Sequence, residues 1–498
     1  MMKILFINPS VDKYNEKKIW TNELTDYLNG RKVTTMPRLV PMILGALTPK
    51  EHRFVHIDEE IEDIDFDITN ADFVGITAMS IQANRAYEIA DEFRRRGVKV
   101  AIGGIHASAL PDEASQHADT VCVGEGENIW PVMLKDFEAG NLKPRYEAKD
   151  YPPVTKLVSP RIDVIKPEHY TAFPLMTSKG CPYDCDFCSI RFSSGNKIRM
   201  KPVSQVIEEV RAFEKHNHGL YRKPYQFVDD NLYLSRSHLI ELFTALKKEK
   251  ISWSGQGTVN SLMDEEVLEL MSASGCRCYH IGFESISEAS LKEANKTTSN
   301  KVEDYDIAIK NLVRHGIAPA GFFILGFDND DKSIFRETLN FAMEKNLINP
   351  YFNTLTPYPG TRLYERIKDR IFDKDWSHYS AAQCVFTPAK MTPEEFEAGK
   401  SWSYNEITKI NVVKKQIEEF WSHGPWKSNP KLNIRERILL FLAGVQLARA
   451  KDKDYKEYSD FCHWAAKQKN ATSVMILFQA IFYAEGAKNN FRGGHNPE

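Results

Sequence analysis

Short continuous apolar runs alternate with amphipathic stretches along the first 370 residues, and this alternation constrains the fold more than any other feature. In the first part of the chain the apolar runs are 3–8, 53–58, 73–79, 99–104 and 120–126. Strands that are apolar at every position are buried on both faces, and strands that alternate with helices form parallel sheets. Residues 1–140 are therefore predicted to form a Rossmann-like or flavodoxin-like α/β domain with a doubly wound parallel sheet.

From residue 173 the alternation resumes with longer units. The apolar runs are 174–178, 225–230, 251–258, 278–285, 320–327 and 351–357, and a helical pattern follows each. Six strand–helix units in series predict a partial (β/α)6 barrel over residues 173–375, with reactive groups at the carboxyl ends of its strands.

Two further regions lack this alternation. The proline-rich stretch 141–172 shows no clear period and is interpreted as a linker. After Trp376 the strand patterns stop, and segments such as 435–450 and 473–486 have helical patterns. Residues 376–498 are therefore predicted to form a mostly helical C-terminal domain that closes over the barrel.

The bulk composition is that of a globular protein. Hydrophobic residues make up 42% and charged residues 27% of the chain, and the formal net charge of −3 is spread without a long basic block, which argues against a nucleic-acid partner. The N-terminal MMKILFINPS is too short for a signal peptide, and no apolar run reaches the roughly 18 residues of a transmembrane helix. We expect a cytoplasmic protein without a transmembrane segment.

Three of the eight cysteines lie within eight residues, in SKGCPYDCDFCSI directly after the first predicted barrel strand. They are Cys181, Cys185 and Cys188. A structural zinc ion takes four protein ligands, and no His or Cys pair at chelating spacing supplies a fourth. A cubane iron–sulfur cluster on three cysteines would leave one iron open to an exogenous ligand, which a catalyst needs. A structural metal site remains the alternative.

The spacing Cys181-x3-Cys185-x2-Cys188, with Phe187 before the last cysteine, resembles the signature of the radical S-adenosylmethionine (SAM) enzymes. The resemblance implies a 4Fe–4S cluster on the three cysteines, SAM on the open iron, and reductive cleavage of SAM to a 5′-deoxyadenosyl radical. It also implies a flavodoxin or ferredoxin-type electron donor. The residues that it suggests for SAM contacts are Phe187, Asp229, Asp230, Glu284 and Gly326.

The N-terminal domain has neither a phosphate-binding loop nor a GxGxxG motif. It has GGIHAS at 103–108 and GEGE at 124–127, after its fourth and fifth strands, where small residues let a broad ligand approach the backbone. Such a domain before this barrel resembles the cobalamin-binding branch of the superfamily. The predicted cobalamin contacts are Ser80, Gly103, Gly104, Gly124, Glu125 and Gly126. The loop after the first strand lacks an axial histidine motif, and His106 is interpreted as an ordinary loop histidine.

GFDND at 326–330, DW at 375–376 and FTPAKMTPEE at 386–395 resemble the hopanoid C-2 methylase-like group. This narrower resemblance implies methylation of an unactivated carbon in an apolar, lipid-like small molecule. Three alternatives remain open at this stage. They are an oxidative cyclase of the porphyrin-cyclase type, a radical SAM enzyme with an empty N-terminal domain, and a non-catalytic metal-binding protein.

Overall fold

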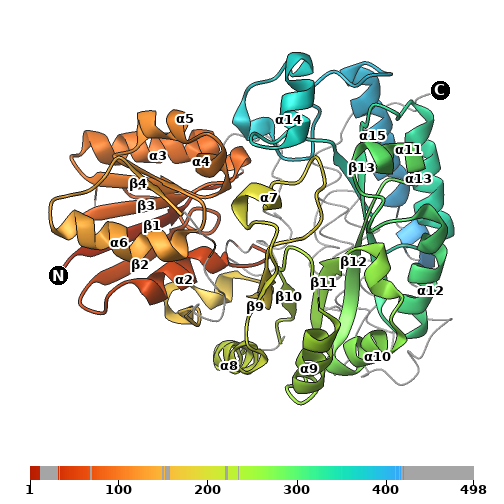
Figure 1. The fold of residues 1–498 in the computed structure, drawn as a ribbon, viewed down its shortest axis with the longest axis horizontal. Helices are drawn as coiled ribbons and strands as arrows, with labels where there is room; N and C mark the ends of the chain where they lie inside the picture. Colours follow the sequence, from red (N-terminus) through yellow and green to blue (C-terminus); the bar gives the residue numbers. More distant parts are fainter. Residues whose placement is uncertain are drawn as a thin grey trace, which may run out of the picture.

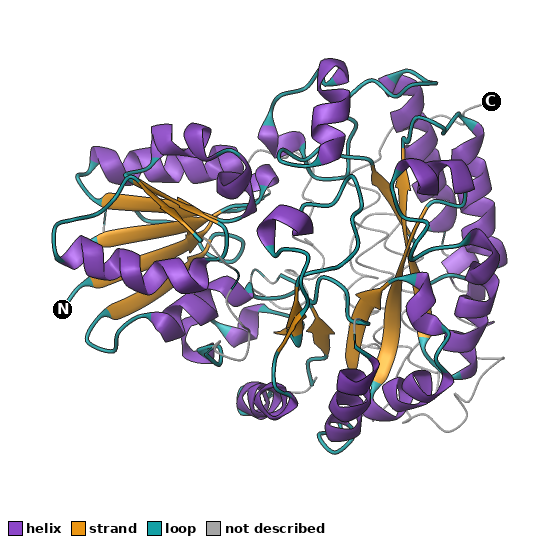
Figure 2. Ribbon diagram, in the orientation of Figure 1, coloured by secondary structure: helices purple, strands orange, loops and turns teal. Residues whose placement is uncertain are grey.

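The computed structural model describes residues 1–11, 32, 34–67, 70–148, 151, 158–218, 222–233, 235–348, 350–409, 411–413, 415–416 and 419. Two parallel sheets, each with its own helices, lie side by side in the described part of the chain (Figures 1 and 2). Most of the predicted C-terminal domain, with the helical patterns at 435–450 and 473–486, lies outside the described residues. No helix within these ranges combines the length and the apolar character that a bilayer crossing requires.

The first sheet is wholly parallel and has the strand order β2-β1-β3-β4-β5-β6. Its strands are β1 (Lys3–Asn8), β2 (Arg53–Asp58), β3 (Phe73–Thr77), β4 (Lys99–Gly103), β5 (Thr120–Val123) and β6 (Arg145–Glu147). This order is the flavodoxin-like variant of the doubly wound fold. The last strand, β6, lies in the stretch 141–172 that was interpreted as a linker. It was not predicted, because three residues are too few to show a period.

Both faces of this sheet are covered, as the continuous apolar strands predicted. The helices are α2 (Leu39–Leu47), α3 (Ala83–Arg95), α4 (Ile105–Ala109), α5 (Pro111–His117) and α6 (Gly126–Glu138). Along β1, Leu5 and Ile7 pack in the core with α3 and α5, whereas Ile4 and Phe6 pack with α2 and α6. Successive side chains of a strand point to opposite faces, so both sets are buried. Figure 1 shows α3, α4 and α5 on one side of the strands and α2 and α6 on the other.

The second sheet is also parallel, in the order β14-β13-β12-β11-β10-β7. Its strands are β7 (Phe173–Leu175), β10 (Tyr225–Phe227), β11 (Trp253–Gly257), β12 (Cys276–Glu284), β13 (Ala318–Leu325) and β14 (Tyr351–Thr354). Each strand lies next to its predecessor along the barrel, and β7 and β14 do not pair. The predicted partial barrel is therefore confirmed as an open half-barrel.

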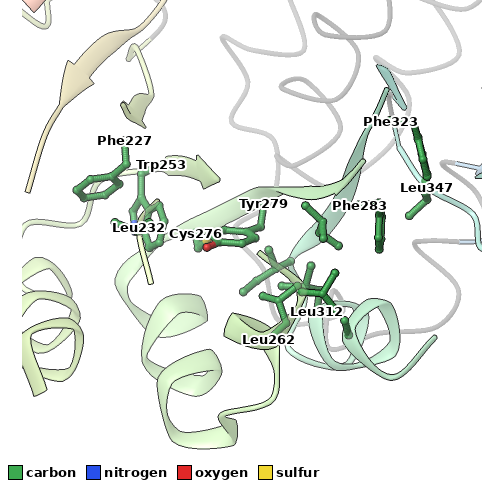
Figure 3. Close-up of a cluster of buried hydrophobic side chains, with 14 of the residues drawn as sticks. Phe227, Leu232, Trp253, Leu262, Cys276, Tyr279, Phe283, Leu312, Phe323 and Leu347 are labelled. Carbon is green, nitrogen blue, oxygen red and sulfur yellow. The ribbon is translucent and has the colours of Figure 1, made fainter. Parts of the chain in front are cut away.

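Helices cover the outer face of the half-barrel (Figure 2). They are α8 (Val203–Glu214), α9 (Arg236–Leu246), α10 (Glu265–Ser274), α11 (Glu288–Glu293), α12 (Tyr305–Arg314), α13 (Ser333–Glu344) and α15 (Pro393–Ile407). The short α14 (Arg362–Ile367) instead contacts the cysteine loop, where the Leu363 N–H donates to the Asp186 carbonyl at 3.0 Å. Large side chains such as Phe227, Trp253, Tyr279, Phe283 and Phe323 fill the space between strands and helices (Figure 3). The Trp253 ring stacks on the Phe243 ring at a centroid distance of 5.2 Å and makes an edge-on contact with the Phe227 ring at 5.0 Å.

A short element between β7 and α8 was not predicted from the sequence. Here β8 (Ser178–Lys179) and β9 (Arg199–Met200) pair antiparallel, and the connection between them contains the three cysteines and α7 (Ile190–Ser193). Two-residue strands carry no periodic signal, so only long-range pairing reveals them. The hairpin lies between the two sheets in Figure 1 and brings the cysteines to the boundary between the domains.

Candidate active site

Two carboxylates at the end of β10, the buried Asp229 and the half-buried Asp230, hold the start of the cysteine loop. Asp229 Oδ1 accepts hydrogen bonds from the Ser178 backbone N–H at 2.5 Å and from the Ser178 hydroxyl at 2.6 Å, and Oδ2 accepts one from the Thr177 N–H at 3.1 Å. Asp230 Oδ2 accepts from the Gly180 N–H at 2.7 Å. Burial raises the pKa of Asp229 to about 7, against the opposing effect of these hydrogen bonds. Both carboxylates therefore support the loop that carries the cysteines.

The loop itself is held by its own backbone. The Cys181 N–H donates to the Gly195 carbonyl at 3.1 Å, and the Cys188 N–H donates to the Cys185 carbonyl at 3.2 Å. Burial raises the pKa of all three thiols, that of Cys188 to about 12, and the nearby Lys296 ammonium opposes this shift. Across the described ranges, no three His, Cys, Asp or Glu side chains are grouped around a point where one metal ion would bind.

Glu284 and Gly326 lie at the carboxyl ends of the neighbouring strands β12 and β13. Glu284 has a φ of +63° and forms an ion pair with Lys296, whose Nζ lies 2.8 Å from Glu284 Oε1. Gly326 has a φ of +105°, and its N–H donates to Asp330 Oδ2 at 2.9 Å. Burial raises the pKa of Asp330 to about 6. Neither Lys296 nor Asp330 was predicted from the sequence. An Asp at the end of GFDND, as Asp330 is, is typical of a side chain that closes a turn onto backbone N–H groups.

A cavity of about 240 Å³ lies between the two domains. The first domain contributes strand ends and loops, which include Gly103, Gly104, Gly124, Glu125 and Gly126. The cysteine hairpin contributes Lys179, Ser193 and Ser194, and Asp230, which follows β10, lines the same cavity. Five of the six residues predicted for cobalamin therefore line one cavity with residues that flank the cysteine loop.

Small residues keep this cavity open. Gly104 has a φ of +98°, and a Cβ there would lie 2.7 Å from the Ala78 carbonyl oxygen. Deeper in the cavity, between the sheet and α6, a Cβ on Gly75 would lie 2.9 Å from the Trp130 ring. A side chain at either position would push against backbone or an aromatic ring. The sheet edge is thus shaped to admit a broad group to its backbone.

Ser80, the sixth predicted cobalamin residue, is absent from the cavity lining. It begins a 3₁₀ turn (Ser80–Gln82), and its hydroxyl lies 3.2 Å from His106 Nδ1. His106 Nε2 lies 3.2 Å from Glu113 Oε1, which also accepts a hydrogen bond from the Trp376 indole N–H at 2.9 Å. The interpretation of His106 as an ordinary loop histidine is wrong, because the side chain is buried in α4 and joins the first domain to the chain after the barrel.

Glu125 joins the two domains directly. Arg199 of β9 donates to both of its carboxylate oxygens, from Nη2 to Oε1 at 2.6 Å and from Nη1 to Oε2 at 2.8 Å. Lys179 of β8 lies 3.7 Å from the same Oε1 and also pairs with Glu127. The carboxylate that begins α6 is thereby bound to the hairpin that carries the cysteines.

Comparison with known proteins agrees with this arrangement. The family model "Radical SAM superfamily" matches residues 175–342, and the model "B12 binding domain" matches residues 35–133. The chain is 32% identical over 404 residues to bacteriochlorophyllide d C-12(1)-methyltransferase of Chlorobaculum tepidum, covering 80% of this chain and 88% of that protein. It belongs to the cobalamin-binding radical SAM family. The C-8(2)-methyltransferase of the same organism is 34% identical, over 73% of this chain and 84% of that protein.

Further relatives of this cobalamin-binding radical SAM protein extend the agreement. The hopanoid C-2 methylase of Rhodopseudomonas palustris is 25% identical over 67% of this chain and 64% of that protein. The structure of the radical SAM methyltransferase TsrM from Kitasatospora setae, with cobalamin and a 4Fe–4S cluster bound, has a TM-score of 0.62 at 15% identity. That match covers 94% of this chain and 99% of the other, and it shows that the two share a fold. The family cofactors are a 4Fe–4S cluster, SAM and cobalamin.

The residues present fit these cofactors. Three soft thiol donors in one loop match the ligand type of an iron–sulfur cluster, and they leave a fourth position without a protein ligand from that loop. The glycines at the ends of β4 and β5 line the cavity and present backbone there instead of side chains, which suits a broad group such as cobalamin. Residues that flank the cysteine loop line the same cavity.

Proposed function

We propose that this protein is a cobalamin-dependent radical SAM C-methyltransferase in which Cys181, Cys185 and Cys188 hold the cluster. When bound, the cluster delivers one electron that cleaves SAM to a 5′-deoxyadenosyl radical, and cobalamin carries the methyl group. The observation that carries the proposal is the cavity whose lining comes both from the cobalamin-domain strand ends and from the hairpin that contains the cysteines. The two relatives at 32% and 34% identity are named as methyltransferases.

The roles of the remaining predicted residues follow from their positions. We assign Phe187, Glu284 and Gly326 to the SAM site, since the latter two end adjacent strands and the Gly326 backbone turns there with positive φ. We assign Asp229 and Asp230 to orienting the cysteine loop toward SAM, because their carboxylates accept hydrogen bonds from residues 177–180. Gly103, Gly104, Gly124 and Gly126 give cobalamin access to backbone.

The proposed substrate is a large, apolar, ring-containing small molecule. The relatives named above act, by their names, on bacteriochlorophyllides and hopanoids, both of which fit this description. The proposed electron donor is a flavodoxin or ferredoxin-type protein, and the proposed location is the cytoplasm, where thiols stay reduced. The 5′-deoxyadenosyl radical formed by cleavage of SAM must be shielded from water, which an apolar substrate in the mouth of the half-barrel would assist.

The proposal is tested by anaerobic reconstitution with iron, sulfide and hydroxocobalamin, followed by metal, sulfide and corrinoid analysis. With reductant, methyl-labelled SAM and a panel of bacteriochlorophyllide-like and hopanoid-like compounds, a methyltransferase forms S-adenosylhomocysteine and 5′-deoxyadenosine and transfers label to a substrate carbon. Absence of bound corrinoid would refute cobalamin-dependent methylation. Turnover to 5′-deoxyadenosine without any label transfer would instead favour a cyclase or an enzyme with an empty first domain.

Replacing Cys185 with Ala tests the cluster assignment. The variant should fold and bind hydroxocobalamin like the wild type but form no 5′-deoxyadenosine, because the loop lies outside both cores. Cys384→Ala, which removes a buried thiol that donates to the Phe386 carbonyl, is the matched control and should retain iron and SAM cleavage. Global unfolding of the Cys185 variant alone would indicate a structural metal site.

A further inference from the structure

The turn that follows α11 is bound to the cysteine loop by its backbone and by a side chain. The Asp186 N–H donates to the Ala294 carbonyl at 3.2 Å. The Asn295 side-chain amide donates to the Asp184 carbonyl at 2.7 Å, and Asn295 has a φ of +54°. These contacts fall on the two residues that flank Cys185. The turn therefore has a fixed position relative to the middle cysteine.

This turn leads directly into Lys296. Lys296 is buried, and its Nζ lies 2.8 Å from Glu284 Oε1. The Glu284 carboxylate is the counter-charge that a buried ammonium requires. Lys296 is thus a buried, ion-paired cation in the residue that follows the turn bound to the cysteine loop.

Lys296 and Glu284 bring opposite charges close to the cysteine loop. The turn that leads into Lys296 is bound to Asp184 and Asp186, on either side of Cys185, and Glu284 is held at the Lys296 ammonium. Both side chains are buried. Charges interact strongly where the surroundings exclude water, so neither charge is screened as it would be at the surface.

We propose that the charges of Lys296 and Glu284 tune the reduction potential of the cluster in opposite directions. The proposal rests on the assignment of the three cysteines as cluster ligands. Reduction moves one electron from an external reductant into the cluster, with no bond made or broken and no proton taken up, so the site gains one negative charge. The Lys296 ammonium favours that gain and raises the potential, whereas the Glu284 carboxylate opposes it.

The test is an anaerobic redox titration with dithionite and mediator dyes, followed by electron paramagnetic resonance of the reduced cluster. It is carried out on the reconstituted full chain without SAM, so that contacts of either residue with SAM do not contribute. We expect Lys296→Met to shift the midpoint potential to more negative values and Glu284→Gln to shift it to more positive values. Lys296→Arg, which keeps the charge, should remain near the wild type.

Lys292→Met is the matched control, because it removes an exposed cation from α11, four residues before Lys296, and should leave the potential unchanged. Equal potentials for Lys296→Met and wild type, or shifts of the same sign in the Lys296 and Glu284 variants, would overturn the proposal. Should Lys296→Met not retain iron, the Glu284→Gln titration decides, since an unchanged or more negative potential there refutes the idea. Loss of iron from the wild type would refute the cluster assignment instead.

Discussion

The ion pair between Glu125 and Arg199 should be the strongest single link between the cobalamin domain and the cysteine hairpin. Its two hydrogen bonds, at 2.6 and 2.8 Å, are bidentate, and the side chains are only 5% and 10% exposed. Arg199→Met keeps most of the side-chain volume but leaves the Glu125 carboxylate buried beside one remaining cation, Lys179, at 3.7 Å. The perturbation thus removes the pair without opening a large cavity.

The expected loss follows from this burial. Removing one partner of a buried pair costs about 3–5 kcal/mol, because the other charge remains without adequate solvation. Lys179 partly offsets the charge of Glu125, so we expect about 3 kcal/mol, near the lower end of that range. Because Glu125 lines the cavity between the domains, the same change should weaken hydroxocobalamin binding several-fold.

Urea unfolding of the anaerobic protein measures the stability change, and equilibrium dialysis measures cobalamin affinity. The matched control is Arg161→Met, which breaks a pair of similar geometry, with Arg161 Nη2 2.6 Å from Asp163 Oδ2, at 40% and 63% exposure. An exposed pair contributes less than about 1 kcal/mol. If Arg199→Met and Arg161→Met destabilise equally and bind cobalamin equally, the reasoning from burial is refuted.

Three further predictions concern other parts of the molecule. Gly104→Ala should weaken hydroxocobalamin binding in dialysis, since its Cβ would lie 2.7 Å from a backbone oxygen, whereas Gly97→Ala, with a φ of +81° and nothing within 4 Å, should not. Burial lowers the pKa of His280 to about 4, so the unfolded state binds a proton between about pH 6.5 and 4 that the folded state does not. The free energy of unfolding therefore decreases as the pH falls through this window. In urea unfolding, His280→Phe should remove about 3 kcal/mol of that decrease. The same pH dependence of the free energy of unfolding in variant and wild type would refute this. Trp376→Phe loses its hydrogen bond to Glu113 and should increase amide exchange in α4 and α5 relative to wild type, while unchanged exchange would show that the link is not stabilising.

Much of the fold could be predicted because the spacing of apolar residues along the chain indicates each strand and helix. Runs such as 4–7 are apolar at every position, and only a strand covered on both faces buries all of them. The position of the three cysteines after the first barrel strand likewise follows from local order. Strands β6, β8 and β9 could not be predicted, because two or three residues do not show a period and their pairing partners are distant in the sequence.

The sequence by itself determined the two α/β units and the loop with three thiols, since periodicity and spacing are properties of neighbouring residues. Only the tertiary structure decided that Glu125 pairs with Arg199, that Lys296 pairs with Glu284, and that Ser80 contacts His106 outside the cavity lining. These pairs join residues that are 12 to 74 positions apart in the chain. Their strength comes from burial, and burial is a property of the packed molecule that no local pattern encodes.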